Sequence, residues 1–220
     1  MKYIIFAFLF IASQALPIAL MAKEHSTKHY LHHKLSKKDK RYPTFLSALQ
    51  LIKERNLKTI IETGTSRCGD KNFEGDGGST IIFAQWAKDY KSEFYSVDLS
   101  EENLLQAKSA VHNLLGKPNS RIHFVCSDSI AFLQSFGRQI DFLYLDSYDY
   151  EENNPLPSQH HHLFEIHAAY PYLTENSVVM IDDCDLPHGG KGRLAIEYLI
   201  DRGWKILENR YQVILIFPKN

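Results

Sequence analysis

The sequence predicts an α/β fold built on a doubly wound, mostly parallel sheet, and three observations lead to this prediction. Short apolar runs typical of strands alternate with stretches whose apolar residues recur at helical spacing. Two of these runs, within 141–149 and 177–185, end abruptly in carboxylates, which is where a parallel sheet presents its ligand-binding groups. The last two runs flank residues 209–211 and predict a closing antiparallel hairpin.

The individual elements follow from local patterns taken in chain order. Phe45, Leu49 and Ile52 recur at i, i+4 and i+7 and predict a helix from Tyr42 to near Asn56. The other expected strands are 59–62, 93–97, 121–126, 141–145, 178–181, 204–208 and 212–217, and the other expected helices are 81–91, 100–116, 129–136, 157–173 and 192–203.

Capping residues and one apolar stripe refine this expectation. Ser79 or Thr80 is expected to cap the helix over 81–91. Ser100 is expected to cap the next helix and Gly116 to end it. The buried stripe expected along that helix consists of Leu104, Ala107, Val111 and Leu114.

The chain divides into three parts. Residues 1–22 are mostly apolar and predict either a cleaved signal peptide or a single membrane anchor. Residues 23–41 form a basic, histidine-rich linker, which by the positive-inside rule favours an anchor that leaves the rest of the chain in the cytoplasm. Export after cleavage of a signal peptide is the alternative. Residues 42–220 are expected to form one domain with a sizeable core.

Charge and cysteine content exclude some functions. The net charge is −1, but in residues 42–220 the acids outnumber the bases by seven, so nucleic acid is not an expected partner. The three cysteines, Cys68, Cys126 and Cys184, have no repeating spacing and do not predict a disulfide framework or a zinc site. Cys126 falls in an expected strand and is predicted to be a small core residue.

Acids that follow two of the expected strands predict a site for a hard cation. Asp146 follows the strand over 141–145, and Asp182 and Asp183 follow the strand over 178–181. Carboxyl ends of parallel strands meet at one edge of a sheet, and carboxylate oxygens are ligands that hold Mg²⁺ together with waters. Adjacent strand residues point to opposite faces, so Asp182 and Asp183 can share an ion only if the strand ends before them.

The turn after the first expected strand predicts a ligand-binding loop. Residues 61–69 read Ile-Glu-Thr-Gly-Thr-Ser-Arg-Cys-Gly, in which Ser66 stands where GxGxxG has its second glycine. A dinucleotide pyrophosphate needs close backbone approach at that glycine, so NAD and FAD are disfavoured. The second strand ends in Asp98, an acid suited to ribose hydroxyls, and the third is followed by Asp128 and Ser129, placed to bond an adenine amine.

This order of strand-end acids resembles the class I S-adenosylmethionine-dependent methyltransferases over about residues 42–220. The resemblance implies a catalytic domain with a Rossmann-like, seven-stranded sheet in the order 3-2-1-4-5-7-6, and S-adenosylmethionine as cofactor. It implies that Asp98 holds the ribose and that Asp128 and Ser129 flank the adenine. The residues it implies around the amino acid end of the cofactor are Glu62, Gly64, Thr65 and Ser66.

The aspartates resemble those of metal-dependent small-molecule O-methyltransferases, in both the catechol and the macrocin branches. The resemblance implies that Asp146, Asp182 and Asp183 bind Mg²⁺, that Asp146 takes part in catalysis, and that the acceptor is a small molecule. Residues 189–195, Gly-Gly-Lys-Gly-Arg-Leu-Ala, also resemble the macrocin branch. Catechol-type enzymes have a lysine base three residues after the first metal acid. Asp149 occupies that position here, so we expect His188 to be the general base.

Other interpretations of the same residues remain open. Asp183-Cys184-Asp185 has the Asp-x-Asp form of metal-dependent glycosyltransferases, although this does not explain the loop over 61–69. A methyltransferase fold that serves only as a binding module is a second alternative. Three consecutive histidines, 160–162, cannot all face one ion from a helix and are expected to be surface or partly packed residues. Tyr148, Tyr150 and the loop over 151–157 are expected to border the acceptor pocket.

Overall fold

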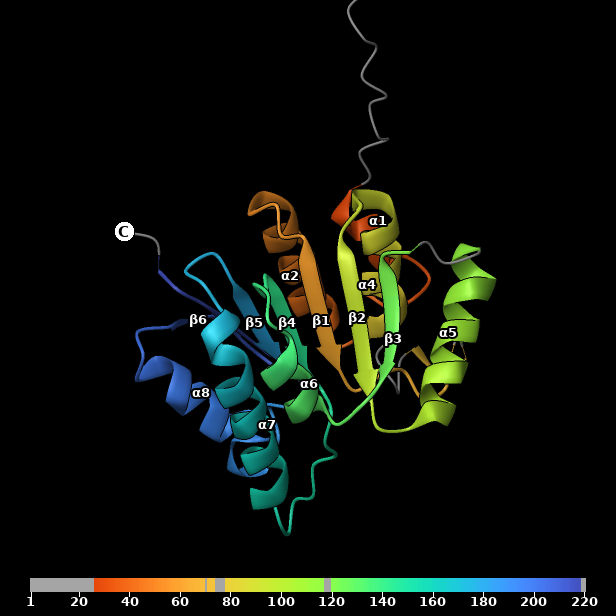
Figure 1. Ribbon diagram of the computed structural model, residues 1–220. Coiled ribbons are helices and arrows are strands. Elements are labelled where there is room, and N and C mark those ends of the chain that lie inside the picture. Colours follow the sequence, from red (N-terminus) through yellow and green to blue (C-terminus); the bar gives the residue numbers. More distant parts are fainter. Residues whose placement is uncertain (1–25, 70, 74–77, 117–119, 219–220) are drawn as a thin grey trace, which may run out of the picture.

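The computed structural model describes residues 26–69, 71–73, 78–116 and 120–218, and its centre is a seven-stranded sheet between two layers of helices (Figure 1). The strand order is β3-β2-β1-β4-β5-β7-β6, with β1 to β5 parallel and β7 antiparallel to both β5 and β6. The predicted doubly wound sheet, its order and its closing hairpin are thereby confirmed. The strands are β1 (Thr59–Thr63), β2 (Glu93–Asp98), β3 (Ile122–Cys126), β4 (Phe142–Leu145), β5 (Val178–Ile181), β6 (Lys205–Asn209) and β7 (Val213–Ile216).

Two groups of helices cover the two faces of the sheet, each with its own apolar cluster. In Figure 1 α2 and α4 lie behind the sheet, and α6, α7 and α8 lie in front of it. The first group is α1 (Thr27–Leu31), α2 (Tyr42–Glu54), α4 (Ser79–Tyr90) and α5 (Glu101–Leu115). The second is α6 (Ser129–Ser135), α7 (Leu156–Ala169) and α8 (Arg193–Ile200), with the short 3₁₀ turns η1 (Tyr170–Tyr172) and η2 (Pro187–Gly189).

Strands β4 and β5 are apolar throughout because both of their faces are covered. In β4, Phe142 and Tyr144 belong to the cluster under α2 and α4, and Leu143 and Leu145 belong to the cluster under α6, α7 and α8. All four side chains are buried. This is the physical reason why the strand shows no polar alternation in the sequence.

Three local expectations are wrong. The N-cap of α4 is Gly78, and Ser79 and Thr80 lie inside the helix with their hydroxyls bonded to Glu62. Leu114 is 48% exposed, because α5 buries Ala110 on its core-facing side instead. Cys126 is exposed, because it ends β3, the edge strand of the sheet. The expected caps of α5 are confirmed at both ends: Ser100 accepts a hydrogen bond from the Asn103 N–H, and the helix stops at Gly116.

The described part of the basic segment packs onto the domain instead of forming a solvated linker. Tyr30 and Leu31 are fully buried, and Tyr30 lies 4.9 Å from Trp86 between ring centroids. The Tyr30 hydroxyl also donates to Asp89 at 3.0 Å. The core therefore begins before Tyr42. The predicted signal peptide or anchor over 1–22 lies outside the described residues, and within those residues no helix is both long and apolar enough to span a bilayer.

Candidate active site

The turn that follows β1 brings two central strands together at their carboxyl ends. Gly64 has a φ of +82°, a left-handed conformation that favours glycine. A Cβ atom at this position would lie 2.7 Å from the carbonyl carbon of Asp146 and closer still to its oxygen. Glycine therefore allows the end of β1 to touch the end of β4, and this contact brings the predicted cofactor turn beside Asp146.

The buried side chain of Glu62 holds this turn in place through hydrogen bonds inside the domain. Its side chain is fully buried, and the hydroxyls of Ser79, Thr80 and Ser96 all donate to its carboxylate. Burial raises the pKa of Glu62 to about 8, although the three hydroxyl groups act in the opposite direction. Thr80 also accepts the backbone N–H of Ser66 at 2.9 Å. Glu62 thus ties β1, β2 and the start of α4 together, and its bonding partners are protein groups.

Asp98, at the end of β2, is oriented by two backbone amides. The N–H of Thr65 donates to one carboxylate oxygen at 3.0 Å, and the N–H of Ser100 donates to the other at 2.7 Å. Each oxygen of an ionised carboxylate can accept more than one hydrogen bond, so Asp98 keeps acceptor capacity for a ligand. The side chain is only partly buried and faces the space above the strand ends.

Two small cavities open over these strand ends and share Gly64, Asp98 and Ser147 as walls. One has a volume of about 80 Å³ and is completed by Val97, Leu99, Ser127, Ser129, Tyr148 and His161. The other has a volume of about 110 Å³ and is completed by Thr65, Arg67, Ser79, Asn103, Asp146 and Asp149. The first lining is partly apolar and aromatic, which suits a planar base, whereas the second is polar and suits charged groups. The three shared lining residues make the two cavities direct neighbours.

Three carboxylates gather at the ends of β4 and β5. One oxygen from each of Asp146, Asp182 and Asp183 lies within 4.8 Å of the other two. Strand β5 ends at Ile181, and Asp183 has a φ of +52°, so the chain turns immediately after the strand. Because of this turn, the adjacent residues Asp182 and Asp183 can face the same side, which a shared ion site requires.

Two cations and a phenol surround these acids. The Lys191 ammonium lies 2.7 Å from Asp146 Oδ1 and 3.0 Å from Asp183 Oδ2. Arg41 Nε lies 3.5 Å from Asp182 Oδ2. The Tyr211 hydroxyl donates to Asp183 and lies 3.4 Å from a terminal nitrogen of Arg41. The cluster is therefore a network of three acids and two bases at one edge of the sheet.

The two cations affect the three acids differently. Burial raises the pKa of Asp182 to about 7, with Asp146 and Asp183 adding to the shift and Arg41 and Lys191 opposing it. Burial also raises the pKa of Asp146 against the effect of Lys191. The pKa of Asp183 is lowered, because Lys191 and the Tyr211 hydroxyl outweigh its burial. Burial alone would lower the pKa of Lys191, but the three carboxylates raise it above its usual value, so this side chain is a permanent cation.

Two other predicted residues lie apart from this arrangement. His188 is exposed on the turn η2 with a φ of +59°, and it lines neither strand-end cavity. The Asp128 carboxylate accepts the backbone N–H of Ala131 and caps α6, so Ser129 reaches the smaller cavity but Asp128 does not line it. Asp149, in the place of a catechol-type lysine, lines the polar cavity and pairs with Arg67 at 2.9 Å.

Sequence reasoning missed the contributions of Lys191, Arg41 and Tyr211. Lys191 belongs to the glycine-rich stretch after β5, but nothing in that stretch says that its side chain turns back to Asp146. Arg41 belongs to the basic segment, whose charge pattern suggested a linker. Tyr211 lies in the hairpin turn between β6 and β7. These contacts join segments far apart in the chain, and no local pattern encodes them.

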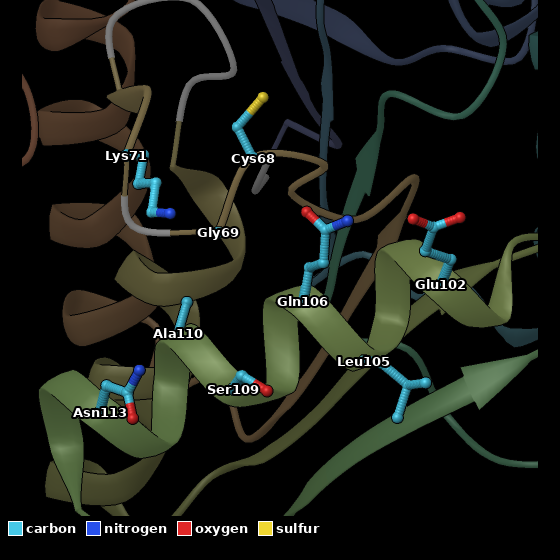
Figure 2. Close-up of a pocket in the computed structure, with 9 residues that line it drawn as sticks. All are labelled: Cys68, Gly69, Lys71, Glu102, Leu105, Gln106, Ser109, Ala110 and Asn113. Carbon is cyan, nitrogen blue, oxygen red and sulfur yellow. The ribbon is translucent and has the colours of Figure 1, made fainter.

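A larger cavity, of about 610 Å³, lies away from the strand-end cluster between α5 and the loop at Cys68–Gly69 (Figure 2). Figure 2 shows Gln106, Ser109 and Asn113 on the side of α5 that faces this space. The residues predicted for cofactor or metal binding do not line it. It is therefore separate from the two cavities over the strand ends.

The sheet order, the strand-end acids and the cavities between them define the class of protein as a class I, S-adenosylmethionine-dependent methyltransferase. The chain belongs to the methyltransferase domain family, whose pattern matches residues 75–184. No curated protein matches the chain.

Solved structures with the same fold include O-methyltransferases of low sequence identity and also an rRNA methylase. The O-methyltransferase NovP superposes with a TM-score of 0.60 at 13% identity, over 82% of this chain and 80% of NovP. The TDP-rhamnose 3′-O-methyltransferase CalS11 of calicheamicin biosynthesis gives 0.56 at 17% identity, over 88% and 94%. An O-methyltransferase from Bacillus cereus, in complex with SAH, gives 0.55 at 14% identity, over 90% and 92%. At these identities the likeness establishes the fold.

Proposed function

We propose that this chain transfers the methyl group of S-adenosylmethionine to an oxygen atom of a small-molecule acceptor. The observation that carries the proposal is the pair of neighbouring cavities that share Gly64, Asp98 and Ser147 as lining residues, with Asp146 in the wall of the polar one. A nucleoside cofactor bound there would present its reactive end to the aspartate cluster. The fold shared with NovP and CalS11, both O-methyltransferases, supports transfer to oxygen.

The proposed orientation of the cofactor follows from the two linings. The adenine would lie in the smaller cavity between Leu99, Tyr148 and His161, and Asp98 would accept bonds from the ribose at the shared wall. The amino acid end would enter the polar cavity near Thr65 and Arg67. In this arrangement Glu62 acts by holding the turn in place, since three hydroxyls already occupy its carboxylate.

The transfer itself is an in-line displacement, so positioning and removal of one proton are what the protein must supply. The acceptor oxygen attacks the methyl carbon, the carbon–sulfur bond breaks, and its electron pair stays on sulfur. The acceptor hydroxyl loses its proton to a base. Asp146 is our candidate, because it lines the polar cavity and burial raises its pKa, which makes it a stronger base than a free carboxylate. His188, expected from the sequence, would need the turn η2 to move.

The sequence predicts a Mg²⁺ ion here, and the three aspartates offer oxygen donors of the kind that Mg²⁺ prefers. Positively charged side chains of the protein, however, already bond these aspartates. Three carboxylates lie together, and Asp182 Oδ1 is buried without a hydrogen-bond partner. However, the Lys191 ammonium bonds two of the three acids, and Arg41 lies beside the third. As arranged, these residues do not fit a divalent ion.

Calorimetry with S-adenosylhomocysteine, S-adenosylmethionine and a UDP-sugar tests the proposed function. We expect one molecule of either sulfur nucleoside to bind per chain and no binding of the UDP-sugar. Binding of the UDP-sugar alone would favour the glycosyltransferase interpretation. Cofactor binding in a chain that methylates none of a panel of phenols, catechols and sugars would favour the binding-module interpretation.

We also propose that residues 1–22 anchor the chain in a membrane with the domain on the cytoplasmic side. The support is the apolar stretch followed by a segment with six lysines and one arginine, since such basic residues are retained on the cytoplasmic side. Fractionation of cells that express the full chain tests this. Recovery in the membrane fraction, with the domain protected from protease outside the cell, is expected. A secreted chain that lacks residues 1–22 would support the signal-peptide alternative.

A further inference from the structure

Lys191 is a buried cation at the centre of the aspartate cluster. Its side chain is 3% exposed, and its ammonium reaches Asp146 and Asp183, which come from the ends of different strands. Arg41 provides the second cation from a third segment of the chain. Three carboxylates thus face two fixed positive charges before any ligand binds.

The backbone around Lys191 is built to bring the lysine to this place. Gly190 has a φ of +58°, and a Cβ atom there would lie 2.8 Å from the carbonyl carbon of Asp183. The Lys191 N–H donates to the same carbonyl group at 3.1 Å. The buried side chain of Gln159 in α7 donates to the carbonyl oxygens of His188 and Gly190, both at 3.0 Å. Hydrogen bonds to the Asp183 carbonyl on one side and from Gln159 on the other therefore hold the loop after β5 in place.

We propose that Lys191 is the resident cation of this site and stands where related enzymes are expected to hold a divalent metal. It acts as a positioning residue, because it orients Asp146 and Asp183 from a fixed point between them. Its consequence for methyl transfer rests on the proposed function, whereas its occupancy of the site does not.

The geometry explains why lysine and a metal exclude each other. A divalent ion bonded to Asp146 and Asp183 would compete with the ammonium for their carboxylates, because Lys191 bonds Oδ1 of Asp146 and Oδ2 of Asp183. It would also lie beside two positive side chains, Lys191 and Arg41, with only three carboxylates to balance a total charge of four. Removal of the lysine charge leaves three acids against one arginine, and a divalent ion then restores the balance.

The first experiment measures Mn²⁺ binding to the full chain by the loss of the free-ion electron paramagnetic resonance signal. The wild-type chain is expected to show no saturable binding at the aspartates. Lys191→Met, which keeps most of the length of the side chain without its charge, is expected to show saturable Mn²⁺ binding, at least about tenfold tighter than any binding by the wild-type chain, a difference of about 1.4 kcal/mol. Adding Asp183→Asn to Lys191→Met should abolish the gain. A gain of binding is an outcome that loss of a merely structural residue does not produce.

Two further variants keep the proposal falsifiable if Lys191→Met does not fold. Lys191→Arg retains a cation and should bind no more Mn²⁺ than the wild-type chain. Saturable Mn²⁺ binding by the wild-type chain that Asp182→Asn removes would overturn the proposal, as would equal Mn²⁺ binding in the Arg and Met variants. The proposed function is judged separately by S-adenosylhomocysteine calorimetry, so its failure and the failure of the lysine assignment are distinguishable.

Discussion

Replacement of Gly64 by alanine tests whether the contact between β1 and β4 builds the cofactor site. The added Cβ would lie 2.7 Å from the Asp146 carbonyl carbon, whereas real Cβ contacts stay at 3.0 Å or more. The end of β4 must therefore recede by at least about 0.3 Å, and further to free the carbonyl oxygen. The two residues that recede, Asp146 and Ser147, belong to the cavity walls.

The expected cost has two parts. A left-handed conformation at alanine costs about 1–2 kcal/mol, and forced displacement in a close-packed region costs about 1–3 kcal/mol. Gly64→Ala should therefore lower the free energy of unfolding by roughly 2–5 kcal/mol. Because it moves walls of both cavities, it should also weaken S-adenosylhomocysteine binding at least about tenfold.

Gly137→Ala is the matched control. Gly137 has a φ of +69°, but the nearest atom to an added Cβ is 3.7 Å away, so only the conformational cost of about 1–2 kcal/mol applies. Urea denaturation gives both stabilities, and calorimetry gives both affinities. If Gly64→Ala lost no more stability than Gly137→Ala and kept its affinity for S-adenosylhomocysteine, the proposed role of the strand contact would be refuted.

Two predictions concern stability. Burial raises the pKa of Glu62 to about 8, so the native state holds an extra proton and the free energy of unfolding falls as pH rises from about 4.5 to 8. Glu62→Gln should remove up to about 1.4 kcal/mol per pH unit of that fall, and parallel denaturation curves for both proteins across the window would contradict the burial argument. Tyr30→Ala should lower the free energy of unfolding by about 3–5 kcal/mol because Tyr30 is fully buried. The control Tyr148→Ala, at a residue 45% exposed, should lower it by less than about 1 kcal/mol. Equal losses of stability in urea denaturation would show that the basic segment is not part of the core.

The fold was largely predictable because its signals are local. The runs that became β4 and β5 are apolar because they are buried on both faces, and Ser100 and Gly116 mark the ends of α5 by their own chemistry. The start of α4 was mistaken because Ser79 and Thr80 have the chemistry of caps, but a tertiary partner, Glu62, takes their hydroxyls. Local preference was overruled there by a buried carboxylate.

The site was predictable only in part. The sequence predicts that three aspartates, Asp146, Asp182 and Asp183, lie close together, because the carboxyl ends of parallel strands meet at one edge of the sheet. The positions of the two cations, Lys191 and Arg41, could not be predicted. The placement of Lys191, for example, depends on Gly190 in the same loop and on Gln159 in the distant helix α7. The place of His188 was hidden for a related reason, because proximity to Asp182 in sequence does not determine the direction in which a turn exposes a side chain.

The most direct test of the central claim is S-adenosylhomocysteine calorimetry on the wild-type chain and on Asp98→Asn. Asp98 accepts two backbone amides and lines both strand-end cavities, and an asparagine amide group cannot accept in place of a carboxylate oxygen. Asp201→Asn is the matched control, because Asp201 is exposed at the end of α8 and lines neither strand-end cavity. Binding of one nucleoside per chain, weakened at least about tenfold in Asp98→Asn and unchanged in Asp201→Asn, is the predicted result. No binding to the wild-type chain, or equal binding to all three proteins, would contradict the account.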